Sequence, residues 1–295
     1  MTAINRFRNR LIGVLLLPVL CASGLSAEVR FFNLKKPQQP LTNPSISQGG
    51  ALALTVPEGS KVWWNGESVF VDTQGMALVA VHRDGDSANL KVILPSGEQS
   101  LMSLPVDKRN YRIERVDGLP PAKVTAPKNP ELQKRIRKES AEIRQARKLM
   151  DDREDYLKGF IWPVKGRISG RYGSQRILNG TPKTPHYGVD VAVLKGTKVV
   201  APADGVIIYA NSDMYYSGGT LVIDHGHGLS SAFLHLSELL VPEGTRVKQG
   251  QVVAKVGATG RATGPHLDWR MNWGKVRVDP QLLVVPMKQA LSKKH

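Results

Sequence analysis

The chain has 295 residues, enough for two domains, and its hydrophobic fraction of 41% is sufficient for ordinary cores, which excludes wholesale disorder. It is strongly basic, since 41 Lys and Arg stand against 25 Asp and Glu and give a formal net charge of +16. The single cysteine, Cys21, excludes an intrachain disulfide framework.

The first 27 residues have the pattern of an export signal. A short region with three arginines precedes an apolar run over residues 11–20, and small residues follow as far as Ala27. We expect cleavage after Ala27, with Gly24 as a less favoured site. An uncleaved membrane anchor is the alternative, but the apolar run is short and Pro18 interrupts it. The sequence therefore predicts an exported protein with no stable transmembrane segment after cleavage.

The positive charge persists in the mature chain. Removing residues 1–27, which carry three arginines and no acidic residue, lowers the net charge from +16 to +13. A basic exported protein suggests an anionic partner such as a wall polymer, a lipid surface or an acidic protein, although solubility alone also explains such a charge. Export and the lack of any nucleic-acid motif argue against nucleic acid.

Residues 28–105 are expected to form a small β domain. Short apolar runs alternate with turns, and Asn65-Gly66 between two such runs is a hairpin signal. Regularly spaced short strands favour a β-sandwich. The segment shows no cluster of catalytic residue types, so we expect the chemistry to lie elsewhere.

Residues 106–158 are expected to be a linker followed by a charged helix. Prolines punctuate the stretch before residue 131, and apolar residues then recur at helical spacing as far as about residue 157. The remaining helix faces are heavily charged. Such a helix either docks on a partner or an anionic surface, or it connects the domains and lies on them with its charged face in solvent; the second interpretation is favoured.

Residues 159–285 are expected to be a second β domain, followed by a tail over 286–295. Strand patterns cover residues 198–200, 205–210, 220–223, 230–235, 251–256 and 265–271, with glycine-rich turns between them. The fold class is therefore mainly β: a sandwich-like N-terminal domain, a charged helical connector and a C-terminal antiparallel sheet.

Three segments of the second domain carry residues that bind metals. In an extended strand, residues two or four apart face the same way, so His186 can lie beside Asp190, and His266 beside Asp268. His235 belongs to a third segment. Imidazoles and carboxylates together are typical ligands of a zinc site. A rival pair, His225 and His227, lies among glycines and is better explained as part of a turn.

The region around these segments resembles the lysostaphin/LytM-type zinc endopeptidases, which cut peptide cross-links in peptidoglycan. The resemblance covers about residues 159–285 and includes Trp162-Pro163, Gly166-Arg167-Ile168-Ser169, Tyr172-Gly173, Ala201-Pro202-Ala203-Asp204-Gly205, Ile223-Asp224-His225-Gly226 and Gly257-Ala258-Thr259-Gly260. It implies an antiparallel metallopeptidase fold, peptidoglycan as partner, and a periplasmic or cell-wall location.

Carried over residue by residue, the resemblance assigns a metal site and a catalytic pair. His186 and Asp190 match metal ligands, and His235 and His266 match the assisting histidines. The third ligand should be a histidine, but this chain has Asp268. Aspartate can bind zinc, yet two carboxylates make Mn²⁺ or another hard divalent ion a better competitor. Tyr172 and Arg261 are expected to contact substrate.

Two functional interpretations follow from this departure. In the first, the protein is a zinc-dependent endopeptidase that hydrolyses peptide bonds in peptidoglycan cross-links or stem peptides. In the second, the site is degenerate, and the domain binds peptidoglycan or activates another wall hydrolase. The first is favoured because the other four residues are present and aspartate is itself a ligand type.

Overall fold

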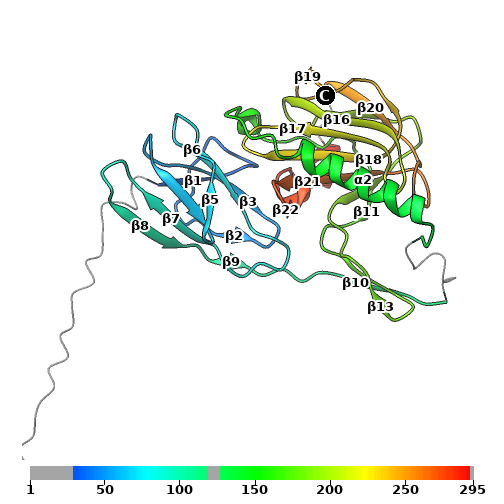
Figure 1. Ribbon diagram of the computed structural model, residues 1–295, viewed down its shortest axis with the longest axis horizontal. Helices are drawn as coiled ribbons and strands as arrows, with labels where there is room; N and C mark the ends of the chain where they lie inside the picture. Colours follow the sequence, from blue (N-terminus) through cyan, green and yellow to red (C-terminus); the bar gives the residue numbers. More distant parts are fainter. Residues whose placement is uncertain (1–28, 119–126, 293–295) are drawn as a thin grey trace, which may run out of the picture.

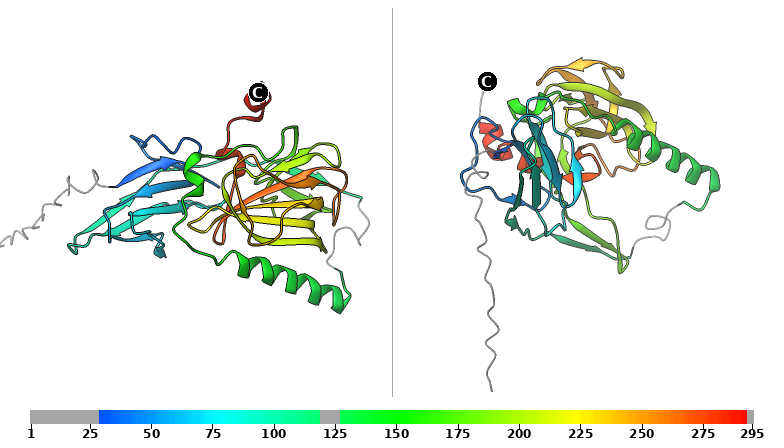
Figure 2. Two further views of the ribbon diagram at one scale, coloured as in Figure 1. Left: turned by 90° about the horizontal axis from the view of Figure 1, so that it is seen from above. Right: turned by 60° about the vertical axis from the view of Figure 1, so that its left-hand side comes forward.

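The computed structural model describes residues 29–118 and 127–292 (Figure 1). The predicted export signal lies outside the described residues, as does part of the predicted linker. Two β domains lie side by side, and one long helix runs along the C-terminal domain (Figures 1 and 2). The mainly β fold class is thereby confirmed. No helix within the described ranges is long and apolar enough to cross a membrane.

The N-terminal domain consists of two sheets and a short parallel pair. One sheet has the order β1 (Arg30–Asn33), β3 (Ala51–Thr55), β6 (Met76–Ala80), and the other β5 (Glu67–Val69), β4 (Lys61–Trp64), β7 (Asn89–Ile93), β8 (Gln99–Ser103); β2 (Ile46–Ser47) pairs with β9 (Val106–Asp107). Side chains of both sheets, including Leu54 and Trp64, share one core.

Strand β3 is buried on both faces because each face packs against a different domain core. Leu52 and Leu54 face the N-terminal core, whereas Ala51 and Ala53 belong to the core of the C-terminal domain. Alternate residues of a strand point to opposite faces, so the small alanines allow close approach on one side while the leucines fill the sandwich on the other. The first sheet is therefore the contact layer between the domains.

The C-terminal domain is built on a ten-stranded antiparallel sheet. Its main path is β11 (Arg167–Gly170), β14 (Val189–Ala192), β21 (Leu267–Trp273), β18 (Leu229–Leu239), β17 (Gly218–Asp224), β16 (Gly205–Met214), β19 (Arg246–Val247), with β15 (Lys198–Val200), β20 (Val252–Val256) and β22 (Val276–Val278) attached. Short helices η2 (Asp155–Lys158), η3 (Pro280–Leu282) and α3 (Met287–Ser292) accompany it, the last in the expected tail. The apolar faces of the central strands form the largest core.

A strand from the segment between the domains pairs with the C-terminal domain. Strand β10 (Ile113–Val116) runs parallel to β12 (Gln175–Leu178), which in turn pairs with β13 (Thr181–Pro182). The chain that leaves the first domain thus contributes a strand beside a hairpin of the second.

Helix α2 (Pro130–Ala146) begins at a well-formed cap. The side chain of Asn129 accepts hydrogen bonds from the next backbone amides, and Pro130 occupies the first turn, where its missing N–H costs nothing. Ile143 and Ala146 pack against apolar residues of the sheet, including Tyr209 and Leu234. One face of the helix thus lies on the sheet of the C-terminal domain.

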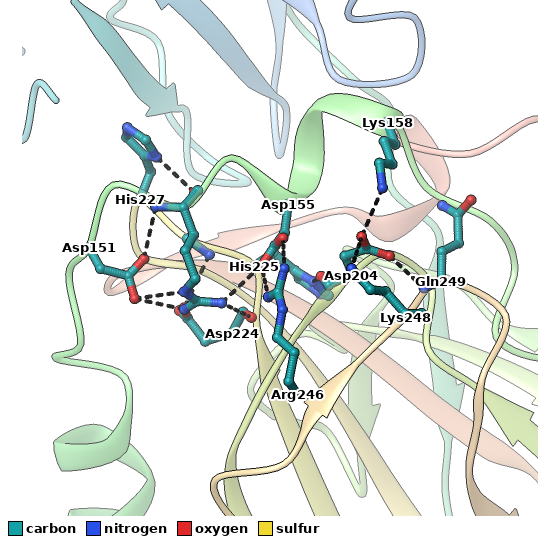
Figure 3. A network of polar contacts seen from close by, with 12 residues as sticks. Asp151, Asp155, Lys158, Asp204, Asp224, His225, His227, Arg246, Lys248 and Gln249 are labelled. Carbon is teal, nitrogen blue, oxygen red and sulfur yellow. Dashed lines mark hydrogen bonds and ion pairs between the residues drawn. The ribbon is translucent and has the colours of Figure 1, made fainter. Parts of the chain in front are cut away.

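The helix is shorter than the periodicity predicts, because it ends at Ala146 rather than near residue 157. The following residues are held by the C-terminal domain instead. Arg153 forms ion pairs with Asp151, Asp155 and Asp224, and the amide of His227 donates to the carbonyl of Asp151 (Figure 3). These tertiary contacts outweigh local helix propensity.

Candidate metal and catalytic site

The three predicted metal ligands converge on one face of the central sheet. Asp190 on β14 lies directly opposite Asp268 on β21, and His186 lies just before β14. One potential ligand atom from each of His186, Asp190 and Asp268 lies within 4.8 Å of the others. Like charges directly opposite one another destabilise a sheet, so this pair of carboxylates requires a nearby cation.

Two atoms of this cluster lack hydrogen-bond partners. His186 Nε2 and Asp190 Oδ1 are both buried and unsatisfied, although they lie 3.1 Å apart. Glycines make room for the carboxylates, since a side chain at Gly170 would collide with Asp190 and one at Gly188 with Asp268. The donor types and the orphaned atoms therefore fit a divalent cation.

Asp268 already has a cationic partner, which the sequence analysis missed. Arg270, two residues further along the same strand face, donates from Nε at 3.0 Å and from Nη2 at 2.6 Å to the carboxylate. Burial alone would raise the pKa of Asp268, but the charge and hydrogen bonds of Arg270 outweigh it and hold that pKa well below its usual value. The sequence contained a signal for this contact, because Asp268 and Arg270 are two residues apart and therefore lie on the same face of a strand.

The two predicted catalytic histidines lie beside each other. The ring centroids of His235 and His266 are 4.9 Å apart. Nδ1 of His235 lies 2.8 Å from the carbonyl of Thr259, and Nδ1 of His266 lies 2.8 Å from that of Gly264. If each Nδ1–H donates to its carbonyl, each Nε2 keeps a free lone pair for proton transfer.

His235 has an unusual backbone for its role. It adopts a φ of +63° at a bulge of β18, and its amide donates to the carbonyl of Ser217. Left-handed backbone in a non-glycine residue is uncommon and often occurs at functional sites. Burial lowers the pKa of His235, which favours the neutral form needed by a base.

A cavity of about 600 Å³ contains both groups of residues. Residues of α2, among them Ser140 and Ile143, form one wall of this cavity together with Arg147 just after the helix, and the strands that carry the candidate site form another. Its size suits a small ligand or a few residues of a peptide.

The two predicted substrate-binding residues occupy different places. Arg261 lines the cavity, with its guanidinium 4.5 Å from the ring centroid of Tyr216. Tyr172 is buried outside the cavity lining, packs closely on Gly49 of the first domain and donates to the carbonyl of Arg277. The domain contact covers the ring of Tyr172, and substrate contact by this residue stays a prediction.

The rival histidines form no second metal cluster within the described residues. His225 is fully buried, with Nδ1 2.7 Å from the carbonyl of Asp204 and Nε2 2.8 Å from the hydroxyl of Ser231. His227 pairs with Asp72 of the N-terminal domain at 3.2 Å. Figure 3 shows both histidines in the polar network beside η2, so their roles are structural.

Known proteins resemble both this domain and the larger chain. Residues 184–280 match the model of peptidase family M23. A crystal structure assigned to peptidase M23 from Pseudomonas aeruginosa is 30% identical, covers 82% of this chain and 96% of its own, and superposes with a TM-score of 0.61. The chain belongs to peptidase family M23. The resemblance predicted for residues 159–285 is thereby confirmed, and the C-terminal domain is hereafter the M23 domain.

Two curated relatives from Vibrio cholerae are similar to part of the chain. Peptidoglycan DD-endopeptidase ShyA is 36% identical over 137 residues, which is 45% of this chain and 32% of the relative. Peptidoglycan DD-endopeptidase ShyB is 39% identical over 108 residues, which is 37% of this chain and 25% of the relative. The matched segment thus spans about a third or less of these relatives.

Proposed function

We propose that this protein is a metal-dependent endopeptidase that hydrolyses peptide bonds in peptidoglycan. The observation that carries the proposal is the convergence of His186, Asp190 and Asp268 within 4.8 Å, in the same cavity as His235 and His266. Similarity to relatives named as peptidoglycan DD-endopeptidases supports the substrate class. An exported, periplasmic or wall-associated protein would meet this substrate.

The metal would be held by His186, Asp190 and Asp268. When bound, a divalent cation supplies Lewis acidity and lowers the pKa of water. Zn²⁺ accepts this nitrogen and oxygen set, and the two carboxylates also suit Mn²⁺. Arg270 shares Asp268 and so reduces the negative charge available to the ion.

The two histidines would perform the proton transfers. Their Nδ1 atoms face backbone carbonyls, which fixes each ring and leaves Nε2 to act. One Nε2 accepts a proton from the attacking water, and the other imidazole, when it carries a proton on Nε2 as well, donates a hydrogen bond to the scissile carbonyl oxygen as negative charge develops there. The short separation of the rings lets both serve one peptide bond.

A second candidate is a non-catalytic domain that binds peptidoglycan or activates another wall hydrolase. The bidentate ion pair between Asp268 and Arg270 favours it, because a permanent internal cation can replace the metal as the partner of the carboxylates.

Metal analysis beside digestion of purified sacculi distinguishes the two candidates. The full chain should contain about one divalent ion per molecule, as expected for a single three-ligand site, and release cut muropeptides. The His186→Ala variant should lose both properties. A wild-type chain that binds sacculi but holds no metal and cuts nothing would refute the peptidase and support the second candidate.

A further inference from the structure

The cavity that holds the candidate site is rich in arginine. Six arginines contribute to its lining within the described residues: Arg144, Arg147, Arg176, Arg261, Arg270 and Arg277. Three carboxylates share that lining, Glu139, Asp190 and Asp268. Glu139 pairs with Arg135, and Asp268 binds Arg270, whereas Asp190 Oδ1 lies 3.1 Å from His186 Nε2 without a hydrogen bond. Arg147 and Arg277 form no ion pair with a carboxylate of the described residues, so they add positive charge to the cavity.

Arg147 is the least compensated of these side chains. It follows the last residue of α2, and its Nε is buried without a hydrogen-bond partner. Within the described ranges it forms no ion pair with a carboxylate. Burial, together with the charges of Arg277 and Arg270, lowers the pKa of Arg147 to about 9. Arg147 as a whole is partly exposed, but a buried guanidinium nitrogen without a partner is a position where an acceptor would be favourable.

Arg277 extends the same positive region toward the metal cluster. Its guanidinium donates to the side-chain oxygen of Asn272 at 3.1 Å. Burial lowers the pKa of Arg277, and the nearby charge of Arg270 lowers it further. Arg270 in turn binds Asp268. Arg147, Arg270 and Arg277 thus line one cavity and are close enough for their charges to act on one another, and within the described residues only Arg270 pairs with a carboxylate.

We propose that Arg147 and Arg277 form an anion site that binds a free carboxylate of a wall peptide. The inference rests on the proposed function for the identity of the ligand, because a peptide seated at the histidines would place its carboxyl groups in the same cavity. Planar guanidiniums bind carboxylates through paired, charge-assisted hydrogen bonds. The site would select substrates whose stem peptides carry an unmodified carboxylate.

Calorimetric titration of the full chain with two probes tests this proposal. The probes are an uncross-linked muropeptide with free carboxyl groups and the same muropeptide with those groups amidated. The free acid should bind about tenfold more tightly or better, as expected for a charge-assisted hydrogen bond to a guanidinium. Arg147→Gln and Arg277→Gln should each remove most of that preference. Mass spectrometry of the recovered probes verifies that they remain uncut.

Arg137→Gln is the matched control, since Arg137 is an exposed arginine of the same helix outside the cavity lining. It should retain the preference. Equal affinity for the two probes, or unchanged preference in Arg147→Gln, overturns the proposal. A titration with inorganic phosphate is the further test. If phosphate binding depends on Arg147 while amidation of the muropeptide has no effect on its affinity, the site binds phosphate and the carboxylate proposal is overturned. Carboxylate preference without sacculus cleavage would refute the peptidase alone.

Discussion

At the residue scale, the balance of charge around Asp268 decides what the M23 domain can do. Asp190 and Asp268 face each other across β14 and β21, and Arg270 is the cation fixed by the chain itself. A divalent ion would be the second cation in the same place. Arg270 and a bound ion would therefore neutralise the same pair of carboxylates. Removal of one cation should make the stability of the folded state depend more strongly on the other.

Arg270→Met should make stability depend on metal. Without metal, the variant leaves buried carboxylates without their guanidinium, a loss of about 3–5 kcal/mol in the free energy of unfolding. Added Zn²⁺ or Mn²⁺ should then raise the melting temperature more than in the wild type, because the ion supplies the missing charge. Differential scanning fluorimetry with and without metal measures this. Arg167→Met, at an exposed position of β11, is the control, and equal metal responses in Arg270→Met and wild type would refute the competition.

His225 should make stability fall in mild acid. Burial lowers its pKa from 6.5 to about 4, so the folded state holds it neutral while the unfolded state takes up a proton below about pH 6.5. Its contribution is complete above pH 6.5 and is lost as the pH falls toward 4, by at most about 3 kcal/mol. Urea unfolding at pH 7.5 and 4.5 tests this. The His225→Gln variant should show a smaller difference between the two pH values, and an undiminished difference would contradict the assignment.

At this scale, candidate site residues could be predicted from the sequence more fully than the side chains that contact them. The five histidine and aspartate positions could be chosen because strand spacing and the family pattern both apply to them. Arg270 could have been noticed, since it shares a strand face with Asp268. Arg147 could not, because only the docking of α2 on the sheet brings the residue after this helix into the same cavity as Asp268.

At the element scale, α2 forms one wall of the cavity and is held there by a buried carboxylate. Glu139 accepts hydrogen bonds from the amide of Tyr215 at 3.0 Å and from Nε of Arg135 at 2.7 Å. Apolar periodicity predicted the helix, and the cap at Asn129 explains its start. The end at Ala146 was not predictable, because Arg153 pairs with Asp224, 71 residues away in the sequence, and that contact competes with the helix.

Glu139→Ala should loosen α2 from the sheet. The variant loses its acceptor for the amide of Tyr215 and should be about 1–3 kcal/mol less stable. Amide hydrogen exchange should accelerate in residues 130–146 more than in the central strands, because local opening then costs less. Lys134→Ala, an exposed change on the same helix, should leave exchange nearly unchanged. Uniform acceleration over the whole chain would contradict a local role.

At the scale of the whole molecule, the two domains share buried surface. Leu78 and Ala80 of β6 pack in the same core as the central strands of the M23 domain, and Asp72 pairs with the buried His227. The apolar run of β3 predicted a buried strand, but a continuous apolar pattern does not say what covers each face. The N-terminal domain was therefore recognisable as a unit, whereas its contact with the second domain was not.

A shared core predicts that both domains unfold together. Differential scanning calorimetry of the full chain should give one transition with equal calorimetric and van't Hoff enthalpies. Leu78→Asp should divide it into two, because a carboxylate buried between the domains disfavours their contact. A wild-type chain with two separated transitions would contradict the shared core.

X-ray absorption at the metal edge tests the central claim most directly, since it reports the atoms bound to an ion in solution. The purified full chain, loaded with Zn²⁺ and then dialysed, should retain the ion with one imidazole and carboxylate oxygens around it, and His186→Ala should lose the imidazole signature. A chain that retains no ion, or a spectrum unchanged in His186→Ala, would contradict a metal site at His186, Asp190 and Asp268.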